Sequence, residues 1–221
     1  ARIARAVAPG LVLHASTQMA IHSLEGARAA TRWGFGQVTL AREMTLAEIA
    51  EISAEGIATE VFIHGALCYS YSGLCLMSAM RNGRSGNRGR CAYPCRERYS
   101  LDEGEGGLAF SMKDLALCED VRKLAKAGVS CLKIEGRMKS PLYVAATTDF
   151  YRRIFDGEFT NDDEMRRAAD DVRTVFSRKW TRLNFSGVRH GDGVDAKITG
   201  PRGAPIGTVD TVRTARDGTR W

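Results

Sequence analysis

The chain has 221 residues, of which 44% are hydrophobic and 26% are charged, so it can bury a sizeable core and its composition is typical of a soluble domain. No apolar run is long enough to span a membrane, and the N-terminus lacks the charged and apolar regions of a signal peptide, so we expect a cytoplasmic protein. The net charge of +6 is small and identifies no partner by itself.

Short apolar segments alternate with amphipathic ones over residues 1–155, a pattern typical of strand–helix units around a parallel sheet. Thr45 and Glu48 form a capping box at the start of one helix, and Gly56 ends that helix. The expected strands are 11–14, 38–40, 60–63 and 132–134, and the expected helices are 24–33, 46–55, 121–127 and 141–155.

We therefore predict an α/β fold in which residues 1–155 form part of a TIM-type (β/α) barrel. A closed barrel has eight strands. Because only about four can be recognised, either the N-terminal strands of the barrel are missing or the sheet is open. The chain lacks an initiator Met and its first apolar run begins at Leu11, so we expect it to start inside a longer protein. A partial barrel exposes sheet edges, which favours self-association.

The character of the sequence changes after residue 155. Residues 156–176 are predicted to be a connecting segment with a charged amphipathic helix at 161–176. Residues 194–198 and 206–212 alternate in polarity and are separated by glycines and prolines, which is typical of a β-hairpin. We therefore predict that residues 177–221 begin a small β domain.

Polar residues follow the predicted strands, at the end where barrel enzymes carry their active sites. They are His14, Glu43, His64, Glu135 and Arg137. From this set we take His64, Glu135 and Arg137 as candidate catalytic residues, since they could transfer protons or bind a carboxylate. The alternatives are ordinary loop residues and, for Glu135 with Arg137, a plain ion pair.

A long cysteine-rich insertion at residues 64–110 follows the third strand, where a short loop is usual. Its four cysteines are separated by six, fifteen and three residues, and they are Cys68, Cys75, Cys91 and Cys95. Clustered thiols in a cytoplasmic protein indicate metal or redox chemistry. Structural zinc sites usually contain closely spaced pairs, and only the last two cysteines have that spacing. The spacing leaves an iron–sulfur cluster, zinc and buried free thiols open.

The same insertion is rich in arginine. Between residues 81 and 98 six arginines are opposed only by Glu97, which indicates an anion-binding surface. Arg84 and Arg88 are candidates for binding an anionic substrate, and Tyr71 is a candidate for stacking on a base. The alternatives are a solvated loop for the arginines and packing around a metal centre for the tyrosine.

Four segments together resemble the collagenase-like peptidase family of unclassified catalytic type, family 32. They are EVFIHGALCYSYSGLCLMS at 60–78, SGNRGRCAYPC at 85–95, LKIEGRMKSPLYV at 132–144 and HASTQM at 14–19. The resemblance implies a barrel that lacks several N-terminal strands here. It also implies a 4Fe–4S cluster held by four cysteines. Members with such a cluster hydroxylate RNA bases or a quinone precursor without using molecular oxygen. Some of those members are thought to take the oxygen from prephenate.

Cys68, Cys75 and Cys91 match the cysteines of that family, and Cys95 is taken as the fourth ligand. Cys118 and Cys131 are the alternatives for the fourth position, although a buried thiol is the more usual state for such isolated cysteines.

Three functions remain to be separated. A peptidase needs an activated nucleophile or a metal-bound water, and no G-x-S-x-G or H-E-x-x-H motif is present, although His64 and Cys68 could form a dyad. An enzyme that hydroxylates a base of tRNA or rRNA explains both the thiols and the arginines. The third reading is a non-enzymatic RNA-binding module with structural zinc.

Overall fold

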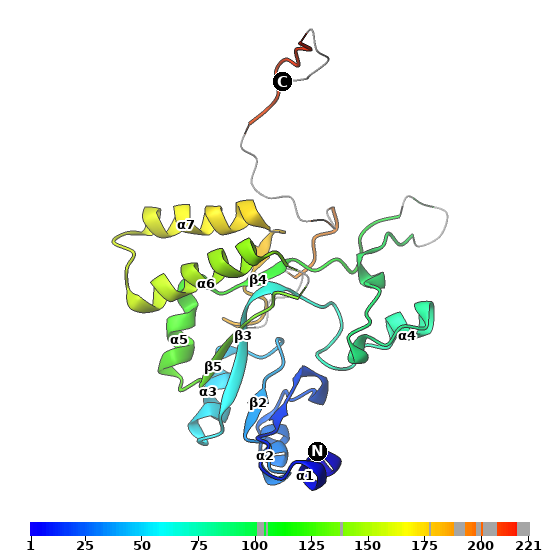
Figure 1. Ribbon diagram of the computed structural model, residues 1–221, viewed down its shortest axis with the longest axis vertical. Helices are drawn as coiled ribbons and strands as arrows, with labels where there is room; N and C mark the ends of the chain where they lie inside the picture. The colour runs from blue at the N-terminus through cyan, green and yellow to red at the C-terminus, as the bar shows by residue number, and fades with distance from the viewer. Residues whose placement is uncertain are drawn as a thin grey trace.

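The computed structural model describes residues 1–100, 104, 106–137, 139–176, 178–187, 193–197, 200 and 207–215, and has a mixed α/β fold (Figure 1). The strands are β1 (His14–Ala15), β2 (Gln37–Thr39), β3 (Thr59–Ala66), β4 (Asp114–Ala116), β5 (Cys131–Ile134) and β6 (Trp180–Thr181). The α-helices are α1 (Arg2–Val7), α2 (Leu24–Arg32), α3 (Leu46–Ala54), α4 (Met77–Asn82), α5 (Val121–Lys126), α6 (Pro141–Asp156) and α7 (Asp162–Val175). Single 3₁₀ turns lie at Thr17–Met19, Gly86–Arg88, Pro94–Arg96 and Cys118–Asp120.

Four parallel strands form the centre of the sheet, in the same order as in the chain. β1 pairs with β2, β2 with β3, and β3 with β5, all parallel. These are the four strands that the sequence predicts. The first strand begins at His14 and not at the predicted Leu11. Because β2 starts only at Gln37, no neighbouring strand lies beside Leu11 and Val12, which are 59% and 68% exposed.

The helices that connect these strands pack on one another in chain order, α2 on α3, α3 on α5 and α5 on α6. Their starts agree with the sequence signals, since the Ser23 hydroxyl accepts a hydrogen bond from the Gly26 amide and Thr45 and Glu48 cap each other reciprocally. Each helix buries its apolar side in one core that includes Val38, Ile52 and Leu124. The arrangement is that of consecutive strand–helix units.

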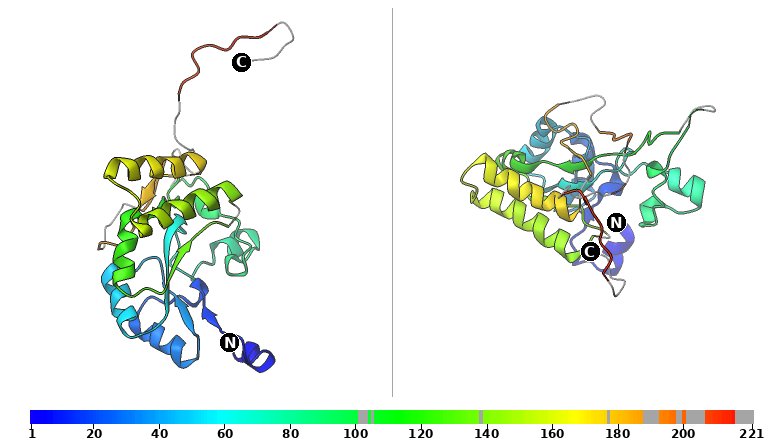
Figure 2. Two further views of the ribbon diagram at one scale, coloured as in Figure 1. Left: turned by 60° about the vertical axis from the view of Figure 1, so that its left-hand side comes forward. Right: turned by 90° about the horizontal axis from the view of Figure 1, so that it is seen from above.

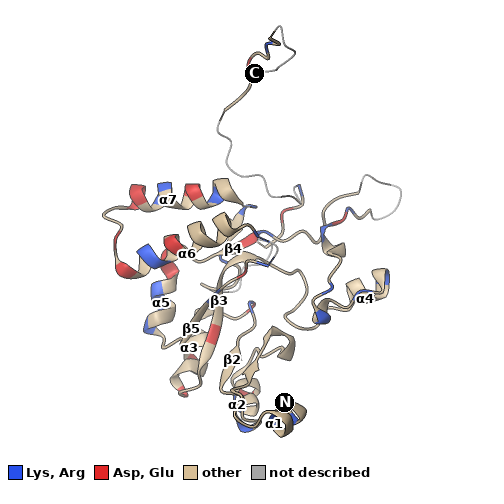
Figure 3. Cartoon of the chain, viewed as in Figure 1, with Lys and Arg blue, Asp and Glu red and all other residues tan. Residues whose placement is uncertain are grey.

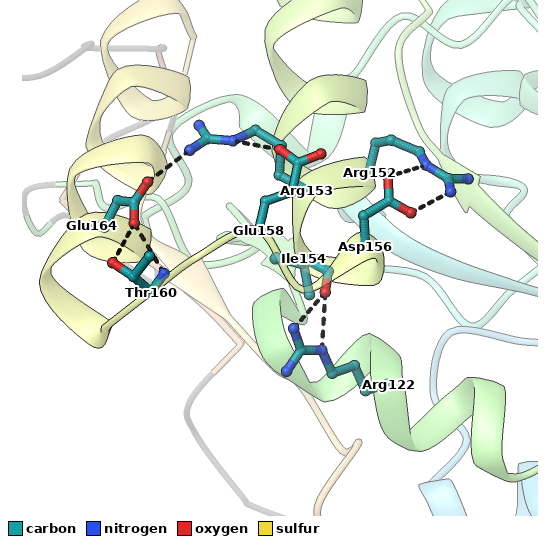
Figure 4. Close-up of polar contacts among 8 residues, drawn as sticks. All are labelled: Arg122, Arg152, Arg153, Ile154, Asp156, Glu158, Thr160 and Glu164. Atoms are coloured by element: carbon teal, nitrogen blue, oxygen red, sulfur yellow. Dashed lines mark hydrogen bonds and ion pairs between the residues drawn. The ribbon is translucent and has the colours of Figure 1, made fainter.

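The predicted helices at 141–155 and 161–176 are α6 and α7, which lie side by side along one flank of the molecule (Figures 1 and 2). Figure 4 shows Arg153 of α6 pointing to two carboxylates, Glu158 of the connecting turn at 3.5 Å and Glu164 of α7 at 3.2 Å. On the other side of α6, the Arg122 guanidinium of α5 donates to the Ile154 carbonyl, with Nε at 3.0 Å. Ion pairs and a hydrogen bond to a helix-end carbonyl therefore hold both ends of the turn between α6 and α7.

Two short strands were not predicted. β4 pairs antiparallel with the end of β3, and β6 pairs parallel with β4. Phe185 is buried and Val194 forms a bridge with Met112, so residues 178–187 and 193–195 return to the main sheet. Of the predicted hairpin strands at 194–198 and 206–212, residues 194–197 and 207–212 are described. Val194 bridges to Met112, whereas residues 207–212 contain no strand and lie apart from the body (Figure 1). A small β domain at 177–221 stays a prediction.

Among the described helices, none combines the length and apolar character that crossing a membrane requires. Among the described strands, β1 is at the edge of the sheet, and Ile3 and Val7 of α1 are exposed. Self-association stays a prediction.

Candidate functional site

A cavity of about 690 Å³ lies at the carboxyl ends of β2, β3 and β5. Arg42 follows β2, Cys68 follows β3, and Glu135 follows β5, so three strand ends contribute to it. Its described lining consists of Arg42, Ala66, Leu67, Cys68, Cys91, Tyr93, Cys95, Arg96, Glu135, Arg137, Lys139 and Arg178. This is the position at which barrel enzymes carry their active sites.

Three of the four cysteines of the insertion meet at this cavity. Cys68, Cys91 and Cys95 line it, and all six cysteines of the chain are free thiols. Burial raises the pKa of Cys95, the Arg96 guanidinium opposes this rise, and the proximity of Cys68 and Cys91 adds to it. Cys75 lies in the loop before α4 and does not line the cavity. Within the described residues, no three Cys, His, Asp or Glu side chains are grouped closely enough to hold one metal ion.

The insertion is fastened to the rest of the molecule by polar contacts. Glu43, predicted to face the strand ends, accepts hydrogen bonds from the Ser72 amide at 3.2 Å and the Ser72 hydroxyl at 2.9 Å. Within the insertion, the buried Ser78 hydroxyl accepts from the Ala92 amide at 2.9 Å. Glu43 therefore anchors the loop that carries Cys75.

The cavity is positively charged. Among its described lining residues, five cationic side chains are accompanied by one carboxylate, that of Glu135. Arg178 also pairs with the buried Asp114 at 3.0 Å. Burial lowers the pKa of Lys139 to about 8, against the opposing effect of the Asp114 carboxylate. The site is suited to an anionic ligand, because guanidinium groups bind carboxylates and phosphates with two hydrogen bonds.

Of the candidate catalytic residues, the structure brings Glu135 and Arg137 to the cavity. The Arg137 amide donates to the Glu135 carboxylate at 3.1 Å, and the Arg137 guanidinium donates to the Gly89 carbonyl of the insertion at 2.9 Å. The two side chains are therefore not a simple ion pair, since the guanidinium bonds to the insertion instead. Their catalytic role stays a prediction.

His64 is placed elsewhere. It is 2% exposed, does not line the cavity, and lies among the rings of Tyr143, Tyr151 and Trp180. Its Nδ1 is 3.1 Å from the Tyr151 hydroxyl. Burial lowers the pKa of His64 to about 4, with the Asp114 carboxylate opposing, so the ring is neutral near pH 7. The geometry gives His64 a packing role, and a catalytic role for it stays a prediction.

The low pKa of His64 predicts a specific pH dependence of stability. Because the unfolded chain takes up this proton near pH 6.5 and the folded chain only near pH 4, acidification favours unfolding over that window. Between about pH 7.5 and about pH 5 the loss from this residue should be about 2 kcal/mol. Urea unfolding at both pH values should show a smaller loss for His64→Gln than for the wild type. Equal losses would mean that the ring is already charged in the fold.

The predicted substrate-binding residues lie on a different surface. Arg84 and Arg88 are exposed, Tyr71 is 45% exposed with its ring edge against His22, and none of the three lines the cavity. We define the α4 surface by its exposed members, Arg81, Arg84, Arg88, Arg90, Tyr69, Tyr71 and Tyr93. Figure 3 shows Lys and Arg positions along the chain around α4. Tyr93 of the α4 surface also lines the cavity, and Arg137 of the cavity donates to the Gly89 carbonyl of the insertion. The α4 surface and the cavity therefore adjoin.

Sequence reasoning missed three cationic residues of the cavity, Arg42, Lys139 and Arg178. Arg42 immediately precedes Glu43, so the rule that selected Glu43 could have found it. Lys139 lies five residues beyond the end of β5, in a segment whose Lys139 amide turns back to the Gly136 carbonyl. Nothing in the sequence pattern indicates Arg178, because β6 is only two residues long.

Comparison with known proteins gives matches over most of the chain. The profile of peptidase family U32 matches residues 1–194. The chain is 37% identical to the 23S rRNA 5-hydroxycytidine C2501 synthase of Escherichia coli over 92% of this chain and 31% of that protein. It is 36% identical to tRNA hydroxylation protein P1 of Bacillus subtilis over 80% of this chain and 43% of that protein.

A relative with a different name matches as well. The chain is 32% identical to a protein named collagenase from Porphyromonas gingivalis, over 83% of this chain and 50% of that protein. The chain thus spans between about a third and half of the length of these three relatives. No solved structure matches the chain at a significant level.

Proposed function

This chain belongs to peptidase family U32, and we propose that it supplies the thiol and arginine site of an enzyme that hydroxylates a base in tRNA or rRNA without molecular oxygen. The observation that carries the proposal is that three thiols and five cationic side chains line one cavity at the strand ends. Two relatives are named for rRNA and tRNA hydroxylation, which supports the same activity.

In this proposal Cys68, Cys75, Cys91 and Cys95 hold a 4Fe–4S cluster, and zinc is the alternative. Such a cluster, when bound, supplies one-electron transfer. The choice of Cys95 is supported by its electrostatic interaction with Cys68 and Cys91. The other cysteines have different surroundings, since Cys118 faces Arg173 and Arg182, and the Cys131 thiol lies 3.6 Å from the Glu60 carboxylate.

The cationic side of the cavity binds an anionic co-substrate, with prephenate as the example that carries carboxylates. Arg137, Arg178 and Lys139 orient the carboxylates through charge-assisted hydrogen bonds. Glu135 lies on the same wall and is the residue in position to accept or return a proton. His64, buried and bonded to Tyr151, takes no part in this step.

The α4 surface binds the RNA. Its arginines are placed to contact phosphates, and its exposed tyrosine rings are placed to stack on unpaired bases. Because this surface adjoins the cavity through Tyr93, a base stacked there lies near the thiols.

The order of the parallel strands supports the same proposal. Four parallel strands in chain order, with helices between them, are the repeating unit of a (β/α) barrel, and the four described strands form part of such a barrel in this proposal. A barrel would place the cavity at its catalytic mouth.

Peptidase activity is the second candidate, because the family label and the relative named collagenase favour it. The one dyad that the sequence offered pairs His64 with Cys68. Cys68 lines the cavity, whereas His64 is buried and its Nδ1 is 3.1 Å from the Tyr151 hydroxyl. The structure therefore offers this candidate less support than the first.

The activity is tested in cells that carry the full-length protein. Deletion of its gene should remove one hydroxylated nucleoside from total RNA, measured by mass spectrometry. The wild-type gene should restore the nucleoside, and Cys75→Ser should not. An unchanged nucleoside profile after deletion would contradict the proposal.

RNA binding by the α4 surface is tested through its dependence on salt. Arg84→Ala and Arg88→Ala should each weaken binding at low salt and reduce the slope of log affinity against log salt by roughly 0.7 on single strands. Arg32→Ala, an exposed residue on α2, is the matched control and should change neither quantity. If the Arg84 and Arg88 variants bind RNA normally but lose cleavage of a peptide that the wild type digests, the peptidase reading is correct.

A further inference from the structure

The guanidinium of Arg96 joins three segments around the thiols. Its Nη2 donates to the Leu67 carbonyl at 2.8 Å, and its Nη1 donates to the Ser111 hydroxyl at 3.0 Å and to the Met112 carbonyl. Leu67 immediately precedes Cys68, and Arg96 immediately follows Cys95. One side chain therefore connects the end of β3, the turn that carries Cys95, and the segment that leads into β4.

The partners of this guanidinium are all neutral, although Arg96 is partly buried. Buried cations are normally paired with carboxylates. The hydrogen bonds of Arg96 described in the structure run to two carbonyl oxygens and one hydroxyl, all neutral acceptors. The carboxylate of β4, that of Asp114, is bound by Arg178. The hydrogen bonds of Arg96 thus hold its side chain in place through neutral acceptors, and the Asp114 carboxylate interacts with its charge electrostatically.

That charge lies beside the thiols. Arg96 lines the same cavity as Cys68 and Cys95. Thiolates ligated to a metal carry negative charge, and the net charge around an iron–sulfur centre is one of the factors that set its reduction potential. Residues that orient metal ligands from outside typically change metal affinity 10–100-fold when they are replaced.

We propose that Arg96 is the positioning residue of the thiol centre, which fixes the separation of Cys68 and Cys95 and stabilises negative charge on them. The proposal depends on the thiols binding a metal centre, as proposed above, but not on the reaction that this centre serves. The fork of the guanidinium supplies the spacing, because it reaches the backbone of two segments at once. Its positive charge favours the more negative, reduced form of the centre.

Two substitutions separate spacing from charge. Arg96→Lys keeps the charge but loses the fork, whereas Arg96→Met loses both. In the anaerobically purified full-length protein, both variants should release metal to a chelator about tenfold faster than the wild type. Only Arg96→Met should also lower the midpoint potential. Arg98→Lys and Arg98→Met, two residues along the chain at an exposed position, are matched controls and should behave as the wild type.

The outcomes distinguish this proposal from the proposed function. If the wild type contains zinc, the cluster assignment fails, and chelator release of zinc from the same variants still tests Arg96. If the wild type binds no metal, peptide mapping of alkylated thiols replaces that assay, and Cys68 and Cys95 should be alkylated several-fold more slowly in Arg96→Met. Wild-type rates of metal release, or of alkylation, in a folded Arg96→Met protein would overturn the role of Arg96. If Arg96→Met does not fold, a wild-type release rate in Arg96→Lys is the contradicting result.

Discussion

Replacement of Cys68, Cys75 or Cys91 by Ser should each abolish iron binding in anaerobically purified protein. A cluster needs thiolate ligands, and a serine hydroxyl keeps its proton and binds iron poorly in their place. The wild type should be brown and contain iron and acid-labile sulfide, and each of these variants should be nearly colourless. Colour, iron and sulfide are measured on the same preparations, with circular dichroism to show that the fold persists.

Cys118→Ser is the matched control for this series. Burial raises the pKa of Cys118 to about 11, so its sulfur stays protonated, and it lies beside Arg173 and Trp180 in a different cavity. The variant should keep its iron. Loss of iron from Cys118→Ser with retention in Cys95→Ser would mean that the fourth ligand has been misassigned. Stoichiometric zinc without iron in the wild type would exclude the cluster altogether.

The spacing of the cysteines predicts that the four thiols of the insertion act together, and the structure places Cys68, Cys91 and Cys95, but not Cys75, at one cavity. The strand–helix units could be predicted because their signals are local, as in the capping box of Thr45 and Glu48. β4 and β6 could not, since they are three and two residues long and form only through pairing with distant segments. Segments this short carry no period that a sequence pattern can reveal.

The site residues could likewise be predicted where the signal is local, and could not where it depends on distant segments. Glu135 and Arg137 lie at the cavity because the rule that polar residues gather at strand ends holds for β5. The rule misplaces His64, because β3 continues beyond the predicted end at residue 63 and runs to Ala66. A register shift between Phe62 and His64 in the pairing with β5 accompanies this extension. His64 is therefore inside the sheet, where its neighbours come from α6 and β6.

Gly65 makes that extension of β3 possible, and it supports the prediction with the largest expected effect on stability. Its φ of +112° is a conformation that residues with side chains rarely adopt. A Cβ added to Gly65 would lie 2.4 Å from the Glu135 carbonyl oxygen and 2.9 Å from the Glu135 Cβ. The nearest obstacle is backbone that is itself bonded to β3, since the Glu135 amide donates to the His64 carbonyl at 2.8 Å.

Gly65→Ala should therefore lower the free energy of unfolding by about 3 kcal/mol or more, because backbone strain and a backbone clash add at one position. Gly56→Ala is the matched control. Its φ of +73° imposes a conformational cost of about 1–2 kcal/mol, but no atom lies within 4 Å of the added Cβ. Urea unfolding of both variants measures the difference. Equal losses would show that Glu135 yields to the new methyl group; a larger loss for Gly65→Ala means that the close approach of β3 and β5 holds Glu135 at the rim of the cavity.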